Sequence, residues 1–359
     1  MTELSRQFTG TTAVSDRHRF DVVALESWLA ANVAGFVGPL TVEQFRGGQS
    51  NPTYRLTGPN AKYVMRTKPA PAVKLLPSAH AIDREYRVQA ALAGTAVPVA
   101  RMLGLCEDES VIGRAFYLME NVEGRVLWDQ DLPESDRAER AAIYDEMNRV
   151  IAALHSVDPA AIGLGDFGKP GNYFARQIGR WSKQYQASAL EPIPAMDRLI
   201  EWLPGRVPAD DESGLVHGDF RLDNLILHPT EPRVLAVLDW ELSTLGHPLA
   251  DFSYHCMAWH VPPGVFRGIG GLDHPALGIP TERQYIEQYC RWTGRDVAAV
   301  LAHWEFYLAY NMFRIAAILQ GVMKRAVEGT AASAQAAEAG SRTRALADLG
   351  WAIAERVGG

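Results

Sequence analysis

The chain has 359 residues, of which 47% are hydrophobic and 21% charged, the composition of an ordinary globular protein of two or three domains. A net charge of −7 argues against a nucleic-acid-binding surface, which needs a basic excess. No apolar run is long enough to span a membrane, and the start of the chain lacks the apolar core of a signal peptide. The three cysteines are widely spaced and odd in number, which favours reduced thiols in a cytoplasmic protein.

The N-terminal part of the chain reads mainly as strands. After a polar start at 1–20, the pattern predicts a helix over 24–34 and strands at 40–46, 53–57 and 63–67. The turn signal Gly58-Pro59-Asn60 joins the last two of these strands as a hairpin. A helix over 79–93 and strands at 99–106 and 115–120 follow. We expect residues 1–120 to form a first domain with a five-stranded antiparallel sheet and one inserted helix.

After Gly124 the pattern becomes helical. Helices are predicted at 134–156, 172–188, 282–293, 297–327 and 331–356, and two strand-like pieces at 225–228 and 234–238. The loop 261–280, rich in Pro and Gly, reads as the most flexible interior segment. We expect residues 121–359 to form a larger, mostly helical domain, so that the fold class is α+β with two lobes.

Two segments of the sequence contain the candidate catalytic and metal-binding residues. Residues 216–224 read Val-His-Gly-Asp-Phe-Arg-Leu-Asp-Asn, and residues 237–241 read Val-Leu-Asp-Trp-Glu. Phosphoryl transfer from ATP uses one carboxylate to orient the attacking hydroxyl and accept its proton, while an amide oxygen and a second carboxylate hold Mg²⁺. We interpret Asp219 as the base and Asn224 and Asp239 as the metal ligands, so ATP and Mg²⁺ are the expected cofactors.

A glycine-rich segment, residues 46–54, joins the first two strands and could let the backbone approach phosphates, although a plain hairpin turn would use the same glycines. The third strand carries Arg66 as a phosphate-binding cation, with Lys68 as a competitor. Glu85 on the following helix is its expected partner, a surface ion pair being the alternative. The segment after residue 118 offers backbone groups to adenine. The expected nucleotide-binding residues are Gly47, Gly48, Ser50, Asn51, Arg66, Glu85, Met119, Glu120 and Val122.

Over about residues 24–330, the chain resembles the aminoglycoside phosphotransferase and choline kinase superfamily, whose fold is that of protein kinases. Segments 47–54, 217–224, 239–241 and 246–251 point to a branch that includes the kinase-like domain preceding acyl-CoA dehydrogenase domains in some larger proteins. The resemblance implies a two-lobed protein-kinase-like fold and the roles given above for Asp219, Asn224 and Asp239. It also implies that Asp251 is structural and braces the catalytic loop. We expect no flavin domain, because the kinase-like lobes account for the whole chain.

The acceptor is expected to be a small molecule. Arg66 in place of a lysine and the unusual glycine-rich segment argue against antibiotic substrates. Arginines beside aromatic residues suit an anionic acceptor, such as a hydroxyacyl-CoA, although structural ion pairs would explain them equally well. Glu241 could approach a metal or face solvent. The candidate acceptor residues are Tyr173, Arg176, Arg180, Glu241 and Arg314, with Arg325 on the same C-terminal helix as Arg314.

Two alternatives remain. A metal-dependent phosphohydrolase could be built from His217, Asp219, Asp239, His255 and His260, although these histidines lack helical pairing with the acids. A non-catalytic nucleotide-binding pseudokinase is the other, against which the complete set of Asp219, Asn224 and Asp239 speaks. We expect no nucleic-acid or membrane partner, and a homodimer is left open.

Overall fold

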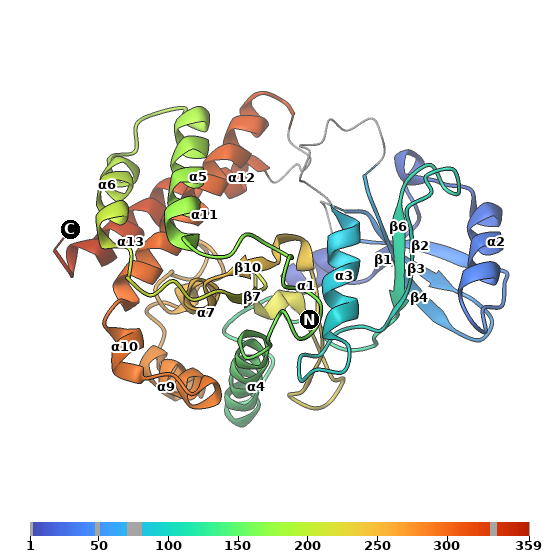
Figure 1. Cartoon of the computed structure of the whole chain (residues 1–359), viewed down its shortest axis with the longest axis horizontal. Helices are drawn as coiled ribbons and strands as arrows, with labels where there is room; N and C mark the ends of the chain where they lie inside the picture. The colour runs from blue at the N-terminus through green and yellow to red at the C-terminus, as the bar shows by residue number, and fades with distance from the viewer. Residues whose placement is uncertain (1–2, 47–50, 70–80, 331–335, 359) are drawn as a thin grey trace. The chain divides into compact units, whose positions relative to one another are not determined.

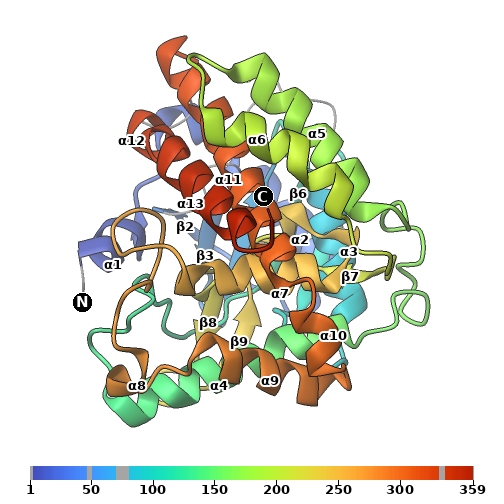
Figure 2. The same cartoon turned by 90° about the vertical axis from the view of Figure 1, so that its left-hand side faces the viewer.

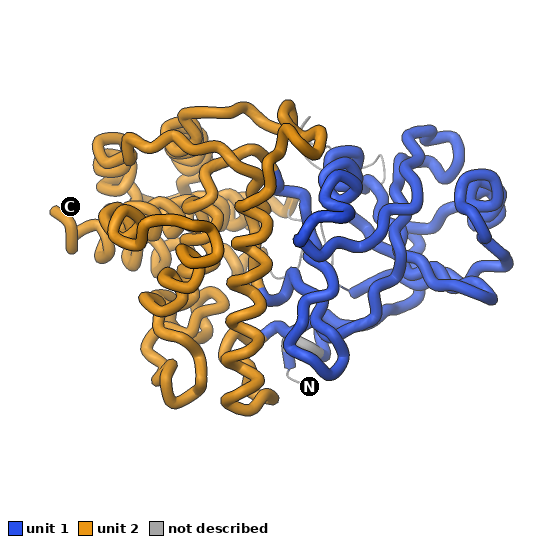
Figure 3. The backbone as a smooth tube through the Cα atoms, turned by 60° about the horizontal axis from the view of Figure 1, so that its bottom comes forward, with its two compact units in different colours: residues 1–128, 222–243 blue, residues 129–221, 244–359 orange. Residues whose placement is uncertain are grey.

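The computed structural model describes residues 3–46, 51–69, 81–330 and 336–358. Its backbone divides into two compact units, which Figure 3 distinguishes by colour. Unit 1 comprises residues 1–128 and 222–243, and unit 2 comprises residues 129–221 and 244–359. The chain therefore returns to unit 1 at residue 222, within the motif at 216–224, whereas the domains expected from the sequence, 1–120 and 121–359, were continuous.

Unit 1 is built on a six-stranded sheet with the order β1-β2-β3-β4-β6-β5, in which every neighbouring pair is antiparallel. Its strands are β1 (Thr11–Thr12), β2 (Thr41–Phe45), β3 (Thr53–Thr57), β4 (Lys62–Thr67), β5 (Met102–Cys106) and β6 (Phe116–Glu120). The expected five strands are present. The sixth, β1, was missed because two residues carry no readable alternation, and it is defined only by its pairing with Gln44 and Phe45.

Two helices cover opposite faces of this sheet (Figure 1), α2 (Val22–Asn32) and α3 (Ile82–Leu92). Strand alternation explains the arrangement, because successive side chains point to opposite faces. Tyr63 and Met65 pack with Leu25 and Leu29 of α2, whereas Val64 packs in the cluster that contains Ile82 of α3. The next residue on the face of Val64 is Arg66, which therefore lies on the α3 side of the sheet.

The remaining elements of unit 1 position the second chemical motif. They are α1 (Glu3–Phe8), η1 (Asp16–His18), η3 (Leu222–Asn224), β8 (Leu225–Leu227), β9 (Val234–Val237) and η4 (Trp240–Leu242). Backbone hydrogen bonds of 2.7 and 2.8 Å between Arg125 and Leu227 fasten this returning segment to the end of the N-terminal chain. A Cβ on Gly124 would lie 2.2 Å from the carbonyl oxygen of Leu227, so only glycine permits this approach.

Unit 2 is helical around α11. Its elements are α4 (Arg137–His155), α5 (Tyr173–Ser188), α6 (Pro194–Trp202), η2 (Leu203–Arg206), β7 (Gly214–Val216), β10 (Thr244–Gly246), α7 (Pro248–Cys256), η5 (Met257–Trp259), α8 (His274–Leu277), α9 (Glu282–Thr293), α10 (Val297–Leu301), α11 (Trp304–Val327), α12 (Ala336–Ser341) and α13 (Thr343–Glu355). Helices α5, α7, α12 and α13 all pack on α11, and Figure 2 shows α13 running along it.

Two long helices expected in this unit are interrupted. The segment expected at 297–327 is divided between α10 and α11, with His303 at the N-cap of α11. The segment expected at 331–356 contains α12 and α13, and its first residues, 331–335, lie outside the described part of the chain. Within the residues that the structure describes, no helix is long and apolar enough to cross a membrane.

Candidate functional site

In unit 1, the side chain of Arg66 links two carboxylates. Its Nε atom lies 2.9 Å from Glu85 Oε2, which makes the ion pair expected from the sequence, and its Nη2 atom lies 2.8 Å from Asp239 Oδ1. Glu241 is a third, more distant acid at 3.7 Å from the same Nη2 atom. The Arg66 and Glu85 side chains are only 10% and 1% exposed, so this is a buried ion pair and not a surface pair.

Neutral polar groups complete the surroundings of Glu85. The Asn51 amide donates to Glu85 Oε1 at 2.7 Å, and the Tyr117 hydroxyl donates to Glu85 Oε2 at 3.1 Å. Burial, and then the charge of Glu85, raise the pKa of Tyr117 well above its ordinary value, so its hydroxyl keeps the proton that it donates. Because both carboxylate oxygens accept hydrogen bonds, α3 holds Glu85 rigidly toward β4.

The charge of Arg66 is secured by its partners. Burial by itself would lower the pKa of Arg66, but the charges of Glu85 and Asp239 outweigh burial and hold the pKa above its ordinary value. The guanidinium is planar and carries several donors, which is why one side chain can contact two carboxylates at once.

The two expected metal ligands, Asn224 and Asp239, lie on joined segments of unit 1. The N–H of Leu238 donates to the carbonyl oxygen of Asn224 at 2.8 Å. Asp239 directly follows Leu238, so this hydrogen bond joins the backbone segments that carry the two expected ligands. Asp239 has φ 62° and ψ 61°, a left-handed conformation that bends the chain from β9 into η4. One carboxylate and one amide oxygen form the small set of hard donors with which Mg²⁺ is commonly bound beside substrate phosphates, so these residues fit that ion.

The expected adenine-binding residues lie at the end of β6. Met119 is 8% exposed and belongs to an apolar cluster with Val64 and Ala100, against which Val122 packs. The Glu120 carboxylate instead accepts the backbone N–H of Arg101 at 2.9 Å. Three further residues of the expected nucleotide site, Gly47, Gly48 and Ser50, lie outside the described part of the chain.

In unit 2, Asp251 holds the backbone of the loop that leads to Asp219. Its Oδ2 atom accepts the N–H of His217 at 2.7 Å, and its Oδ1 atom accepts the N–H of Gly218 at 2.8 Å. His155 Nε2 lies 3.2 Å from Oδ2. Burial opposes ionisation of Asp251, but the hydrogen bonds and charges of His155 and His217 outweigh it and lower the pKa of the carboxyl. Asp251 is therefore charged at neutral pH and accepts with both oxygens.

Asp219 has two contacts within unit 2. The Tyr254 hydroxyl donates to Asp219 Oδ1 at 2.5 Å, and the guanidinium of Arg221 lies 2.9 Å from Oδ2. Burial and the charge of Asp219 raise the pKa of Tyr254 well above its ordinary value, so the hydroxyl remains a donor. The Asp219 side chain is 19% exposed, which leaves it accessible to a small ligand.

Most of the expected acceptor residues support the protein itself. Arg314 donates to the carbonyl oxygen of Gly218 at 2.8 Å and lies over the Tyr254 ring at 5.3 Å, so it stabilises the loop before Asp219 from α11. Arg176 donates to the carbonyl oxygen of Lys169 at 2.6 Å, and Arg180 lies over the ring of Trp181 at 4.9 Å.

The other expected acceptor residues are dispersed. Tyr173 is buried at the start of α5, Arg325 is exposed near the end of α11, and Glu241 belongs to unit 1 beside Arg66. The sequence could not distinguish structural arginines from ligand-binding arginines, because either kind is seen in the sequence only as a charged residue within a predicted helix.

The histidines of the alternative phosphohydrolase site have other partners. His217 Nδ1 accepts the N–H of Asp219 at 3.2 Å, His255 Nε2 lies 2.8 Å from the Tyr285 hydroxyl, and His260 Nε2 lies 2.8 Å from Glu282. In residues 3–46, 51–69, 81–330 and 336–358, no three His, Cys, Asp or Glu side chains are grouped as a metal site would need. The structure thus gives this alternative no support.

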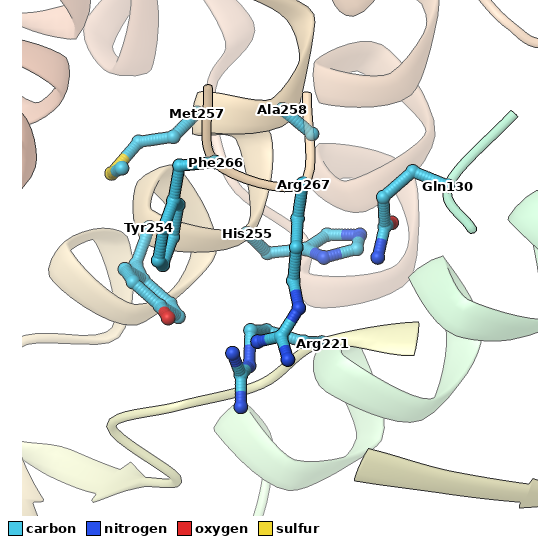
Figure 4. Close-up of a pocket in the computed structure, with 8 residues that line it drawn as sticks. All are labelled: Gln130, Arg221, Tyr254, His255, Met257, Ala258, Phe266 and Arg267. Atoms are coloured by element: carbon cyan, nitrogen blue, oxygen red, sulfur yellow. The ribbon is translucent and has the colours of Figure 1, made fainter. Parts of the chain in front are cut away.

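A hollow in unit 2 contains residues that sequence reasoning missed (Figure 4). Two of them, Arg221 and Tyr254, are the residues that contact Asp219. The spacing of Tyr254 three residues after Asp251 on α7 was an available signal, because residues three apart share a helix face. The residues that line the hollow are Gln130, Arg221, Tyr254, His255, Met257, Ala258, Phe266 and Arg267.

Residues 41–304 match the model of a family described as the phosphotransferase enzyme family. The chain is also similar to curated proteins. It is 48% identical over 338 residues to acyl-CoA dehydrogenase family member 10 of Mus musculus, covering 93% of the chain and 31% of that protein. It is 43% identical over 355 residues to family member 11 of Rattus norvegicus, covering 97% of the chain and 45% of that protein. The chain thus spans about a third to a half of the length of these relatives.

Solved structures share the fold. A crystal structure from Ralstonia eutropha JMP134, provisionally named an aminoglycoside phosphotransferase, is 63% identical with a TM-score of 0.85 and covers 94% of this chain and 99% of its own. A thermostable mutant of aminoglycoside phosphotransferase APH(4)-Ia, in a ternary complex with AMP-PNP and hygromycin B, is 19% identical with a TM-score of 0.57 and covers 91% and 98%. These likenesses confirm the kinase-like fold class expected from the sequence.

Proposed function

The chain belongs to the phosphotransferase enzyme family, and we propose that it transfers the γ-phosphoryl group of ATP to a hydroxyl group of an anionic small molecule. Hydroxyacyl-CoA esters are the acceptor class that we favour. The observation that carries this proposal is the fixed carboxylate of Asp219, which lies in a loop held by both oxygens of Asp251 and is itself contacted by Tyr254 and Arg221.

In the proposed reaction, Asp219 accepts a hydrogen bond from the acceptor hydroxyl and takes its proton as the oxygen attacks the γ-phosphorus. Breaking the bond between the γ-phosphorus and the bridging oxygen leaves ADP, and the acceptor becomes a phosphate monoester. Asn224 and Asp239 would hold Mg²⁺, which supplies positive charge against the phosphate oxygens. Arg66, kept charged by Glu85, is the proposed phosphate-binding cation of unit 1.

Two observations favour an anionic acceptor. The hollow next to Asp219 is lined by Arg267 and by Arg221, of which Arg221 is paired with Asp219. The curated relatives carry acyl-CoA dehydrogenase names, although the chain covers less than half of each.

The test is ADP release with MgATP and a panel of acceptors that includes 3-hydroxybutyryl-CoA, longer hydroxyacyl-CoAs, free hydroxy acids and hygromycin B. We expect turnover with an anionic acceptor, and a kcat lower by at least about 100-fold in Asp219→Asn, the scale of a general base. Asp348→Asn, which makes the same change on an exposed face of α13, is the control and should match the wild type. Turnover by Asp219→Asn at the wild-type rate would remove Asp219 from the role of base.

A further inference from the structure

One face of helix α7 contacts three consecutive residues of the chain, the last of which is the proposed base. Asp251 accepts the N–H groups of His217 and Gly218 at 2.7 and 2.8 Å. Tyr254, three positions further along the helix, donates its hydroxyl to Asp219 Oδ1 at 2.5 Å. Because residues three apart share a helix face, the face that fixes the loop backbone also contacts the side chain of Asp219.

The Tyr254 side chain has little freedom to move. The residue is 5% exposed, and the guanidinium of Arg314 lies over its ring at 5.3 Å. The same arginine donates to the carbonyl oxygen of Gly218 at 2.8 Å, so one side chain of α11 contacts both the loop and the tyrosine. A tyrosine has two side-chain torsions, and packing against its ring restricts both of them, so the hydroxyl of Tyr254 is a fixed donor.

Helix α7 is itself anchored to α11 by a buried amide. The Asn311 side chain, which is fully buried, donates to Ala250 O at 3.0 Å and to Ser253 Oγ at 2.8 Å. These two acceptors directly precede Asp251 and Tyr254 in the chain. All of these residues belong to unit 2, so the core packing of one compact unit sets where the two contacts with the loop are made.

The contact with Tyr254 bears on the orientation of the Asp219 carboxylate. Burial, and then the charge of Asp219, hold the pKa of Tyr254 well above its ordinary value, so the hydroxyl keeps the proton that it donates. A hydrogen bond to Oδ1 restricts rotation about the Cβ–Cγ bond, and this rotation decides where the lone pairs of both oxygens point. A general base must present such a lone pair to the hydroxyl whose proton it takes.

We propose that Tyr254 is a positioning residue, whose hydroxyl holds the Asp219 carboxylate in the rotation that accepts the proton of the acceptor hydroxyl. The proposal rests on the proposed function and adds a residue from outside the two motif segments. Tyr254 acts through the base and takes no proton itself. A hydroxyl that only satisfied a buried polar group would contribute to stability and leave the base unaffected, which the experiments below distinguish.

The first test is the kinetics of Tyr254→Phe, which removes one hydroxyl and keeps the ring. With MgATP and the acceptor of the panel that turns over fastest, kcat should fall by about tenfold or more, the scale of a hydrogen bond to a charged group. The KM values for ATP and for the acceptor should stay within about twofold, because Tyr254 is not proposed to contact either substrate. A wild-type kcat in this variant would overturn the proposal.

Tyr144→Phe is the matched control. Tyr144 is also fully buried in unit 2, on α4, and its hydroxyl donates to the carbonyl oxygen of Gln130 at 2.8 Å. The control therefore removes the same buried donor without a contact to the proposed base. It should lose stability but keep the wild-type kcat, and a fall in kcat equal to that of Tyr254→Phe would show that any lost buried hydroxyl has this effect.

A double-mutant cycle separates positioning from an independent role. If Tyr254 acts through Asp219, its hydroxyl has no effect on rate once the carboxylate is absent. The double variant of Tyr254→Phe and Asp219→Ala should then match Asp219→Ala in kcat within about twofold. A further fall of about tenfold in the double variant would mean that Tyr254 acts independently of the base, and would overturn the proposal.

The same cycle in urea unfolding does not require turnover. The effects of Tyr254→Phe and Asp219→Ala on the unfolding constant should be non-additive by at least about threefold, whereas those of Tyr144→Phe and Asp219→Ala should be additive. Non-additivity without phosphorylation of any acceptor would support the fixed carboxylate and count against the kinase reaction alone. Additive effects of Tyr254→Phe and Asp219→Ala would overturn the positioning role even if an acceptor is phosphorylated.

Discussion

The guanidinium of Arg66 lies 2.8 Å from the carboxylate of Asp239, although 173 positions separate the two residues in the chain. The same guanidinium is paired with Glu85 on its other side. In the proposed reaction, Asp239 therefore serves two positive partners, the buried arginine of the sheet and Mg²⁺. This relationship makes the position of Asp239 depend on the N-terminal sheet as well as on its own strand, β9.

We predict that Asp239→Ala abolishes the metal-dependent part of ATP binding, because one of two protein ligands is lost from a site that Mg²⁺ shares with phosphates. Calorimetry with MgATP, and with ATP plus a chelator, should give the same weak affinity in the variant and different affinities in the wild type. Glu231→Gln, at the exposed turn between β8 and β9, is the control. Wild-type MgATP affinity in Asp239→Ala would disprove the assignment.

Removal of the buried carboxylate of Glu85 should be costly. We predict that Glu85→Ala lowers the free energy of unfolding by about 3–5 kcal/mol, because Arg66 loses a partner that is 1% exposed. Glu43→Ala removes the partner of Arg55 on the same sheet, where both side chains are 34% exposed, and should cost at most about 1 kcal/mol. Urea unfolding measures both values. Equal losses in the two variants would show that burial does not govern the Arg66 pair.

Because Asp251 accepts two backbone hydrogen bonds, we predict that its Asn and Ala variants lose stability in successive steps. Asp251→Asn retains one acceptor oxygen for the N–H groups of His217 and Gly218, whereas Asp251→Ala retains none. Stability should fall by about 1–3 kcal/mol for each buried donor left without an acceptor, so the order is wild type, Asn, Ala. Thermal or urea unfolding gives the order. Activity should fall in the same sequence, and an Ala variant as stable as the wild type would contradict the brace.

Stability should depend on pH through His255. Burial lowers the pKa of His255 from 6.5 to about 4, although the charge of Asp251 opposes this shift. The unfolded chain then takes up a proton below pH 6.5, whereas the folded chain does so only near pH 4. The stability that neutral His255 contributes is complete above pH 6.5 and is lost as the pH falls toward 4, by about 1.4 kcal/mol per pH unit.

The test is urea unfolding at pH 7 and pH 5. The wild type should lose about 2 kcal/mol more than His255→Gln over this interval. His228→Gln, whose side chain is 28% exposed in unit 1, is the control and should retain the wild-type dependence. If His255→Gln showed the same loss as the wild type, the dependence would have to come from other titratable groups, such as His247, whose pKa is also lowered by burial.

The sequence determined those features that depend on local spacing. Alternation along 63–67 placed Arg66 on the opposite sheet face from Tyr63 and Met65, and the helical pattern over 79–93 supplied Glu85 as its partner. The motif segments also indicated Asp219, Asn224 and Asp239 without knowledge of the fold. Spacing is sufficient in such cases because the geometry of one strand, helix or turn fixes where its own side chains point.

Only the tertiary structure decided how distant segments meet. The pairing of β1 with β2 and the return of 222–243 to unit 1 depend on contacts between residues far apart in the chain. The same holds for Arg314, which reads as a ligand-binding cation in the sequence but binds the carbonyl oxygen of Gly218. A charge in an apolar helix is compatible with either role, and the choice is made by the hydrogen-bond acceptor that packing brings to it.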